Sequence, residues 1–331
     1  MGHLPKVRTN ACFPFYSCGV DFAGPFMISS RKGRGNRIMK CYLCLFVCLS
    51  TKAIHLELVS ELSTQAFILC LRRFVSRRGK CHEIYCDNGR NFVGTNNELG
   101  RLLRSSRQSV GDYACSEGIK FVFSPAYSPH FGGIFEAGIK SAKFHLKRVA
   151  GNAALTFEEL ATLFAQIEAI LNSRPLTPLS SNCTDPSPLT PGHFLIGRPL
   201  TSIPTKPITA IRPNRYELIE KIRQHFWERW RREYISELQQ RTKWRTGQQG
   251  LACGDVVVLK EDNLPPLQWR MGRVCRLYPG ADGVSRVADV TTSRGIIRRA
   301  INKLCLLPTS ESNDDSDPER AVSEPRNTSS S

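Results

Sequence analysis

The sequence lacks the long apolar run that a membrane span requires, and its first residues do not form a secretory signal. A transmembrane helix needs about 20 predominantly apolar residues, so we expect no membrane segment. The apolar stretch 38–50 is shorter than that and is typical of a buried strand. Met1 and Gly2 are followed by Lys6, where a myristoylated N-terminus carries serine or threonine.

Metal-binding motifs of cysteine and histidine are also lacking. The 13 cysteines are an odd number without a secretory signal, so we expect reduced thiols inside the cell. Cys41 and Cys44 have a zinc-like spacing, but residues three apart on a strand point to opposite faces. No His-x-x-x-His pair accompanies them, so we expect no zinc site.

What the sequence has in excess is positive charge. It holds 46 basic and 29 acidic residues, for a net charge of +17. Residues 309–331 contain six acids and two arginines, a net of −4, so the rest of the chain carries +21. This charge predicts a polyanionic partner, with nucleic acid favoured over a membrane surface.

The first half of the chain alternates strand and helix patterns. The predicted strands are 15–28, 38–49, 52–59, 83–86 and 120–123, and the predicted helices are 63–76 and 96–104. The polar stretch 101–118 is expected to be an inserted loop. This order predicts an α/β fold of the ribonuclease-H-like class, with a mixed five-stranded sheet and flanking helices.

The second half predicts three further parts. Thr156 begins a capping box for a helix that ends near Asn172, and the proline-rich stretch 175–213 is expected to be an extended connection. Residues 214–241 form a long basic helix with an apolar residue every four positions. Such a ladder packs on a neighbour more often than it stacks on bases. Residues 254–307 predict a small SH3-like β-barrel.

These patterns give five segments. They are an N-terminal remnant 1–14, a catalytic core 15–200, a basic helical linker 201–250, a β-barrel domain 251–308 and a disordered tail 309–331.

A predicted helix from Ile134 carries one carboxylate and three lysines on neighbouring positions. With Glu136 at zero on a helical wheel, Lys140, Lys143 and Lys147 fall within about 40° of it. The apolar residues, including Leu146, fall on an adjacent face that would bury. A solvated face with favourable Glu-to-Lys spacing would give the same pattern.

Three carboxylates are expected to converge in this fold. Asp21 lies on the first strand, Asp87 ends the fourth strand, which adjoins the first, and Glu136 lies on the helix that would cross both. Clustered carboxylates repel one another unless cations neutralise them. Oxygen ligands suit Mg²⁺, and two such ions can promote an in-line phosphoryl displacement.

Several motifs, in this order, resemble the catalytic core of a retroviral-type integrase. They are Gly-Val-Asp-Phe-Ala-Gly-Pro at 19–25, Asp-Asn-Gly-x-Asn-Phe at 87–92 and Pro-His-Phe-Gly-Gly-x-x-Glu at 129–136. The closer resemblance is to integrases of BEL/Pao-type long-terminal-repeat retrotransposons. It rests on the segments 169–176, 189–197, 226–230 and 243–244.

The resemblance implies a polynucleotidyl transferase that processes DNA 3′ ends with water and then joins them to host DNA. Asp21, Asp87 and Glu136 would be the catalytic and metal-binding triad for two Mg²⁺ or Mn²⁺ ions. The implied DNA-binding residues are Lys140, Lys143, Lys147 and Asn91.

The implied partners are the element's DNA ends, the host target DNA and further copies of this chain, in the nucleus at the time of integration. No small-molecule cofactor is implied. A catalytically silent DNA-binding relic and a ribonuclease-H-like nuclease are the alternatives.

Two features depart from the family pattern. Forty-eight residues separate Asp87 from Glu136, more than in retroviral integrases, and the stretch 101–118 can account for the surplus. The family's N-terminal zinc domain has no counterpart, which an internal polyprotein methionine at Met1 would explain.

Overall fold

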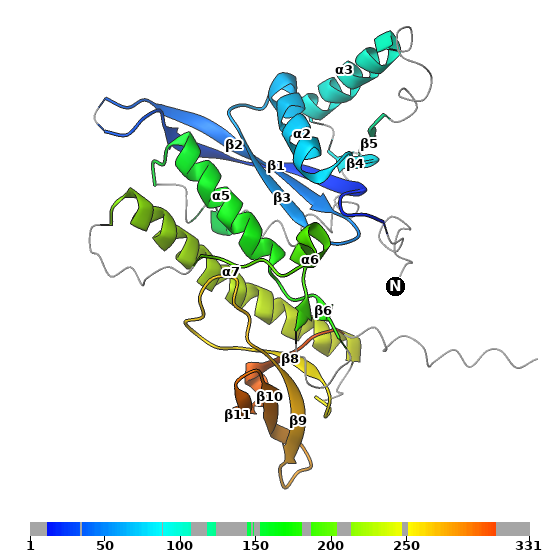
Figure 1. Ribbon diagram of the computed structural model, residues 1–331, viewed down its shortest axis with the longest axis vertical. Helices are drawn as coiled ribbons and strands as arrows, with labels where there is room; N and C mark the ends of the chain where they lie inside the picture. The colour runs from blue at the N-terminus through cyan, green and yellow to red at the C-terminus, as the bar shows by residue number, and fades with distance from the viewer. Residues whose placement is uncertain are drawn as a thin grey trace, which may run out of the picture.

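The computed structural model describes most of the chain as three connected parts: a first sheet, a long helix and a second sheet (Figure 1). The described residues are 12–33, 35–87, 89–106, 118–123, 144–146, 148, 153–180, 187–203, 213–246 and 251–308. Within these ranges, no helix has the length and apolar character needed to cross a membrane.

The first sheet is mixed and five-stranded, with the strand order β3-β2-β1-β4-β5. Its strands are β1 (Ser17–Ser29), β2 (Ile38–Cys48), β3 (Ile54–Val59), β4 (Glu83–Cys86) and β5 (Lys120–Phe123). β1, β2 and β3 pair antiparallel, whereas β1 with β4 and β4 with β5 pair parallel. The α/β class and the mixed five-stranded sheet expected from the sequence are therefore confirmed.

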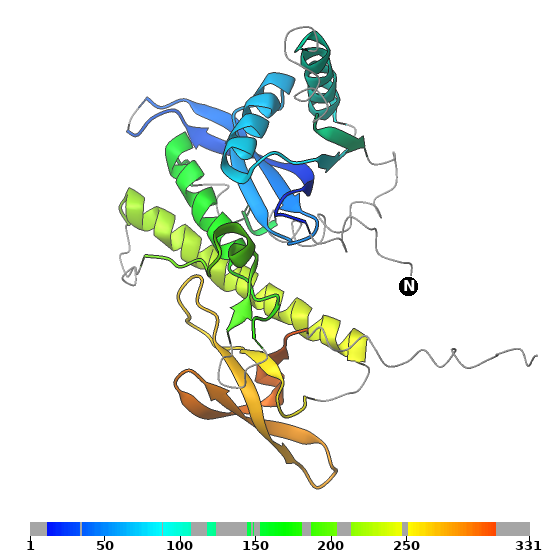
Figure 2. The same cartoon turned by 45° about the vertical axis from the view of Figure 1, so that its right-hand side comes forward.

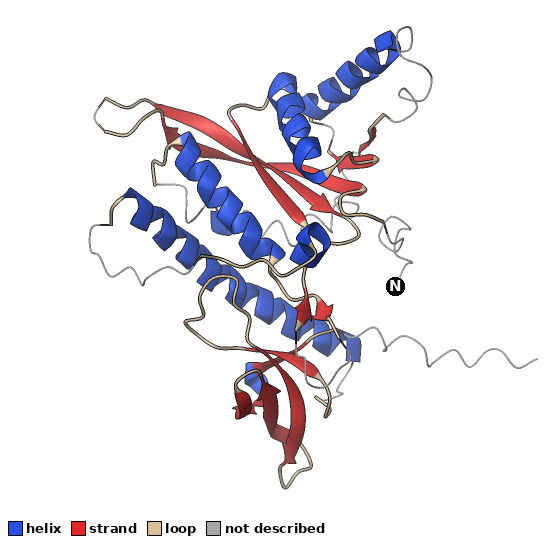
Figure 3. Ribbon diagram, in the orientation of Figure 1, coloured by secondary structure: helices blue, strands red, loops and turns tan. Residues whose placement is uncertain are grey.

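Helices cover both faces of this sheet (Figure 3). α2 (Thr64–Arg78) and α3 (Arg90–Ser106) lie on one face, and α5 (Phe157–Asn172) lies on the other. Cys41 belongs to the apolar cluster on the α5 side and Cys44 to the cluster on the α2 side, which confirms that they face opposite ways. The cysteines in the described ranges are free thiols.

The outer edge of β3 is closed by side chains of helices rather than by another strand. Asn172 accepts a hydrogen bond from Ile54 N at 2.8 Å and donates one to Ile54 O at 2.7 Å. Glu168 accepts from Leu56 N at 2.8 Å. Arg73 donates to Leu58 O at 3.2 Å. An edge strand normally presents these groups to any passing chain, so the capping leaves this edge unable to add a strand.

β3 also carries a buried charge network. Glu57, only 5% exposed, accepts from Arg73 Nε at 2.6 Å and from Arg77 Nη1 at 2.7 Å. His55 lies between Glu57 and Glu168, at 3.2 Å and 3.1 Å. Burial favours a lower pKa for His55, but the hydrogen bonds to Glu168 and Glu57 outweigh it and the pKa is raised. The polar side chains of β3, His55 and Glu57, are thus covered by helices and do not face solvent.

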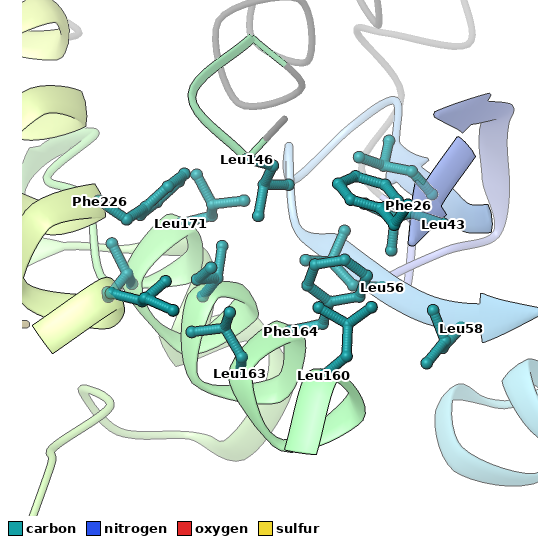
Figure 4. Close-up of a cluster of buried hydrophobic side chains, with 14 of the residues drawn as sticks. Phe26, Leu43, Leu56, Leu58, Leu146, Leu160, Leu163, Phe164, Leu171 and Phe226 are labelled. Carbon is teal, nitrogen blue, oxygen red and sulfur yellow. The ribbon is translucent and has the colours of Figure 1, made fainter. Parts of the chain in front are cut away.

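α7 (Arg215–Thr246) belongs to two hydrophobic cores. Its first half places Ile222, Phe226 and Trp230 in the cluster formed by α5 and the first sheet, part of which Figure 4 shows. Its second half places Ile235 and Leu238 against the second sheet. α7 therefore runs between the two sheets (Figure 2). Its apolar ladder packs on neighbours, as expected, and is not free to stack on bases.

The second sheet is five-stranded and antiparallel, with the order β11-β10-β9-β8-β12. The strands are β8 (Val256–Leu259), β9 (Met271–Pro279), β10 (Ser285–Thr292), β11 (Gly295–Ala300) and β12 (Leu304–Leu306), with a short 3-10 helix, Ile301–Lys303, before β12. The sequence patterns predicted the first four strands and missed β12. Closure into an SH3-like barrel stays a prediction.

The expectation of an extended proline-rich connection is wrong in part. The stretch after α5 contains a two-stranded hairpin, β6 (Thr177–Pro178) with β7 (Pro188–Leu189), and the helix α6 (Pro191–Ile196). Proline is tolerated at a hairpin edge and at the first position of a helix, which is where these prolines lie.

Candidate active site

Asp21 lies on β1, and Asp87 directly follows the neighbouring parallel strand β4. β1 and β4 pair with Gly19 opposite Tyr85. Asp21 is two residues after Gly19, and Asp87 is two residues after Tyr85, so the parallel register directs both carboxylates to the same end of the sheet. Because side chains alternate between faces with a period of two, Asp21 shares the face of Gly19, and the position of Asp87 continues the face of Tyr85. The sequence-based expectation that the fourth strand adjoins the first is confirmed.

That face is the one covered by α5. Asp21 pairs with Leu45, which belongs to the α5-side cluster, and directly opposed residues point to the same side. The next residue, Phe22, points the other way and packs with the α2-side cluster. Asp87 likewise follows Cys86, which is buried in the α2-side cluster. Both carboxylates therefore emerge on the α5 side.

A tight turn after β4 fixes Asp87. Gly89 N donates to Asp87 Oδ1 at 2.9 Å. A Cβ atom placed on Gly89 would lie 2.9 Å from Asp87 Oδ1 and 2.8 Å from Asn91 Oδ1. Real Cβ atoms do not come that close to other heavy atoms, so only glycine lets the Asp87 and Asn91 side chains approach the turn together.

Asn91 lies in the first turn of α3 and has an unused donor. Its Nδ2 atom is buried and has no hydrogen-bond partner within the part of the chain that the structure describes. Buried donors are normally satisfied, so this amide is a group that a ligand oxygen could engage. Its neighbour Thr95 donates to the Asn91 carbonyl at 2.8 Å, which holds the turn in place.

Aromatic rings beneath the site tie α3 to the sheet. The residues that follow Asp21 and Asn91 are Phe22 and Phe92, whose rings stack at 5.4 Å. Phe67 of α2 meets Phe92 edge-on at 4.8 Å. Offset and edge-on contacts of this kind stabilise a packed position beyond the area they bury. They set the place of Asn91 relative to Asp21.

The chemistry of the donors fits a hard cation. Cys86 lies next to Asp87, but burial and the nearby carboxylate raise the pKa of its thiol to about 12. Burial, a hydrogen bond with Cys70 and smaller effects that include Asp21 raise the pKa of Cys44 well above its usual value. Both thiols belong to the α2-side cluster, away from the face that carries Asp21, so carboxylate oxygens are the ligands on offer. Oxygen-only ligation favours Mg²⁺ or Mn²⁺ over zinc.

The third carboxylate and the lysines lie outside the described residues. These are Glu136, Lys140, Lys143 and Lys147. Among the residues that the structure does describe, no group of three or more potential metal ligands is present. Residues 144–146 are helical, and Leu146 is fully buried in the α5-side cluster, as the wheel predicted for its apolar face (Figure 4).

The motifs gave no role to two residues with specific contacts. One is Gly89, in the turn beside Asp87, and the other is His145, which contacts α7. His145 is buried and its Nε2 bonds to a carboxylate oxygen of Glu233 on α7. The Asp-x-Gly spacing could have pointed to a turn at Gly89. No local pattern links His145 to a residue so distant in the chain.

Comparisons with known proteins give three results. A family of unknown function (DUF5641) matches residues 214–307, which span α7 and the second sheet. No curated protein sequence matches the chain. Among solved structures, the chain is similar to a chain of the simian T-cell lymphotropic virus intasome, solved by cryo-electron microscopy in complex with the PP2A regulatory subunit B56 gamma. The identity is 14%, the match covers 93% of this chain and 83% of that one, and the TM-score is 0.36.

The chain is also similar to the catalytic core domain of BIV integrase. The identity is 16%, the match covers 42% of this chain and 73% of that one, and the TM-score is 0.28. Both similarities are too distant to assign a fold or a function.

Proposed function

We propose that this chain is a DNA integrase of retroviral type, from a BEL/Pao-type retrotransposon. It would process the 3′ ends of element DNA and join them to host DNA. The observation that supports the proposal is the parallel register of β1 and β4, which directs Asp21 and Asp87 to the same end of the first sheet. The ordered motifs at 19–25, 87–92 and 129–136 support it, as does the net positive charge.

Each residue has a distinct role in this proposal. Asp21, Asp87 and Glu136 would hold two Mg²⁺ or Mn²⁺ ions, which when bound supply an activated nucleophile and a stabilised leaving oxygen. The Gly89 turn fixes the rotamer of Asp87. Asn91 offers its buried amide donor to a DNA oxygen.

Lys140, Lys143 and Lys147 would bind phosphates of the element end. The ribonuclease-H-like core at 15–200, the linker at 201–250 and the barrel at 251–308 belong to the same proposal, as do multimers of this chain and action in the nucleus.

The proposal is tested by strand transfer with a pre-cut DNA end and a supercoiled target in Mn²⁺. The parent should join the two DNAs. Asp21→Asn, Asp87→Asn and Glu136→Gln should each reduce joined product below detection, because each removes a carboxylate ligand from the ions. Asp282→Asn, an exposed turn residue of the second sheet, is the matched control and should keep full activity.

The same assay separates the alternatives. Cutting without joining by the parent would indicate a ribonuclease-H-like nuclease. DNA binding with neither cutting nor joining would indicate a silent relic. Joining by Asp87→Asn at the parental rate would show that the register pair is not the catalytic centre.

Gly89→Ala tests the turn without changing a charge. The added methyl group would push aside Asp87 and Asn91, so strand transfer should fall at least tenfold, which is about 1.4 kcal/mol of transition-state stabilisation. The rise in melting temperature that millimolar Mn²⁺ gives the parent should shrink as well. A variant with the parental rate and the parental rise would show that the turn does not position Asp87.

A further inference from the structure

Five basic side chains form a line on the outer surface of α7. Lys221, His225 and Arg232 are exposed and Arg229 is half-buried, all on α7. Arg148, exposed on a neighbouring helical segment, completes the set. We call these five residues the α7 basic stripe. With His225 at zero on a helical wheel, the other three α7 members of the stripe lie within about 40° of it. The four residues span roughly 17 Å along the helix axis.

The members of the stripe are close enough to affect one another. Arg229 Nε donates to His225 Nε2 at 2.8 Å, so the His225 ring accepts with that nitrogen. Burial, Arg229 and Arg148 lower the pKa of His225, with only Glu228 opposing them among the larger effects. Like charges aligned on one helix face destabilise the helix slightly. Their concentration here does not serve stability.

Little negative charge offsets the stripe. Within the described residues, Asp262 reaches Arg232 at 3.8 Å, with both side chains largely exposed, and such a pair contributes little. Glu228 borders the stripe, whereas Glu233 is bonded to His145. The surface is therefore cationic along its length.

Two other basic residues of α7 are not part of this surface. Arg223 is 5% exposed and pairs with the equally buried Glu220. Arg231 is 3% exposed and lies over the Trp227 ring at 5.7 Å. Both lie within the stretch 214–241 that the sequence predicts to be a basic helix. The structure instead separates buried arginines that belong to the core from exposed cations that do not.

We propose that the α7 basic stripe binds the sugar-phosphate backbone of duplex DNA without reading its sequence. Lys221, Arg229 and Arg232 are cations held on one side of a rigid helix, with the polar His225 between them, and such cations suit phosphates, which dominate the affinity of proteins for DNA. The aromatic rings of α7 nearest the stripe, Phe226, Trp227 and Trp230, are buried, so they cannot stack on bases. Core packing on the adjacent face of α7 holds the stripe in place before binding. The inference rests on the proposed function for the choice of DNA as the polyanion.

The test is the salt dependence of binding to a random 20-base-pair duplex, followed by fluorescence anisotropy. Lys221→Gln with Arg232→Gln removes two cations of the stripe. The slope of log K against log salt should become shallower by about 1.8, because each lost phosphate contact removes roughly 0.9. An unrelated duplex should give the same change.

Arg37→Gln with Arg72→Gln is the matched control. It removes the same charge from exposed positions on the β1–β2 loop and on α2. Its slope should stay at the parental value.

The outcomes distinguish this inference from the proposed function. If the stripe variant has the same salt slope as the control variant while the parent still binds DNA, the stripe is not the DNA-binding surface, and the proposed function is unaffected. A parent that binds no duplex overturns the proposed function itself. A parent that binds anionic vesicles through the stripe, but not DNA, overturns the inference in favour of a membrane surface. Unchanged melting temperatures confirm that both double variants are folded.

Discussion

The two sheets of this protein differ in how deeply their charged side chains are buried. The first sheet is covered by helices on both faces, and its charged residues His55 and Glu57 are buried beneath them. The second sheet leaves much of one face open, where Asp289 pairs with the exposed Arg298 across β10 and β11. Charges in the first sheet are therefore expected to determine stability, whereas those in the second are largely solvated and replaceable.

Two carboxylates make the comparison direct, because each binds two arginines. Glu57 in the first sheet is 5% exposed and bonds Arg73 and Arg77. Glu261, beside the second sheet, is 18% exposed and bonds Arg270 at 2.8 Å and Arg299 at 3.3 Å. The two carboxylates share this pair of arginine contacts, but Glu57 is more buried and also contacts the buried His55 at 3.2 Å.

The largest effect is expected for Glu57→Gln. Glu57 and its partner His55 are both buried, so removing the Glu57 carboxylate leaves His55 without one of its two acidic partners, and the free energy of unfolding should fall by roughly 3 kcal/mol. Glu261→Gln should cost about 1 kcal/mol or less, because solvent screens its pairs. Urea denaturation of both variants checks this. If the two variants lost the same free energy of unfolding, burial of the charge would not explain the difference between the two sheets.

A smaller loss is expected for Asn172→Ala. The Ile54 amide and carbonyl would both be left buried without partners, which should cost roughly 2 kcal/mol. Asn302→Ala, at an exposed position before β12, should change the free energy of unfolding by less than about 0.5 kcal/mol. If Asn172→Ala were equally mild, water would be replacing the side chain at the β3 edge.

The pH dependence of stability should belong to the first sheet. The pKa of His55 is raised in the folded protein. Protonated His55 therefore adds to the free energy of unfolding in full below its ordinary pKa of 6.5, and this stabilisation is lost as pH rises through the pKa of the folded state. The melting temperature should therefore fall more between pH 6 and 8.5 in the parent than in His55→Gln. Residues 251–308 contain no histidine, so histidine titration in the second sheet adds nothing to the pH dependence of stability. Parallel pH profiles would exclude His55 as the source.

The smallest effect is expected for Asp289→Asn. Arg298 and Tyr278 hold the pKa of this half-buried carboxyl at about 2, so its contribution to stability is present above its ordinary pKa of 3.8 and is lost as pH falls toward 2. Between pH 5 and 8 the variant should therefore melt slightly below the parent, by a small and constant amount, because solvent screens the exposed Arg298. A loss as large as that of Glu57→Gln would mean that the open face of the second sheet is structurally coupled to its core.

Local patterns predicted the elements well where they reflect short-range physics. The capping box at Thr156 forms as expected, with Thr156 Oγ1 accepting from Glu159 N and Glu159 accepting from Thr156 N. The strands at 83–86 and 120–123 have the predicted bounds. The adjacency of Asp21 and Asp87 followed from strand order, because parallel strands bring equivalent ends together.

What the sequence did not reveal depends on long-range contacts. The β3 pattern gave no sign that His55 and Glu57 would be buried, with Arg73 and Arg77 of α2 bonded to Glu57. The basic pattern of residues 214–241 likewise did not show that Arg223 pairs with the buried Glu220 or that Arg231 lies over Trp227. A pattern of residue types cannot report which partner lies across a tertiary contact, and burial of a charge depends on that partner.

The long helix α7 also has a mechanical consequence. Its 32 residues form a rod of about 48 Å that is clamped in the first core at one end and in the second core at the other. Such a rod acts as a lever. A tilt of about 5° at the first clamp would displace the far end by roughly 4 Å. A load placed on the second sheet is therefore transmitted to the first core along α7 and through direct contacts such as that of Trp269 Nε1 with Ser173 Oγ at 3.2 Å.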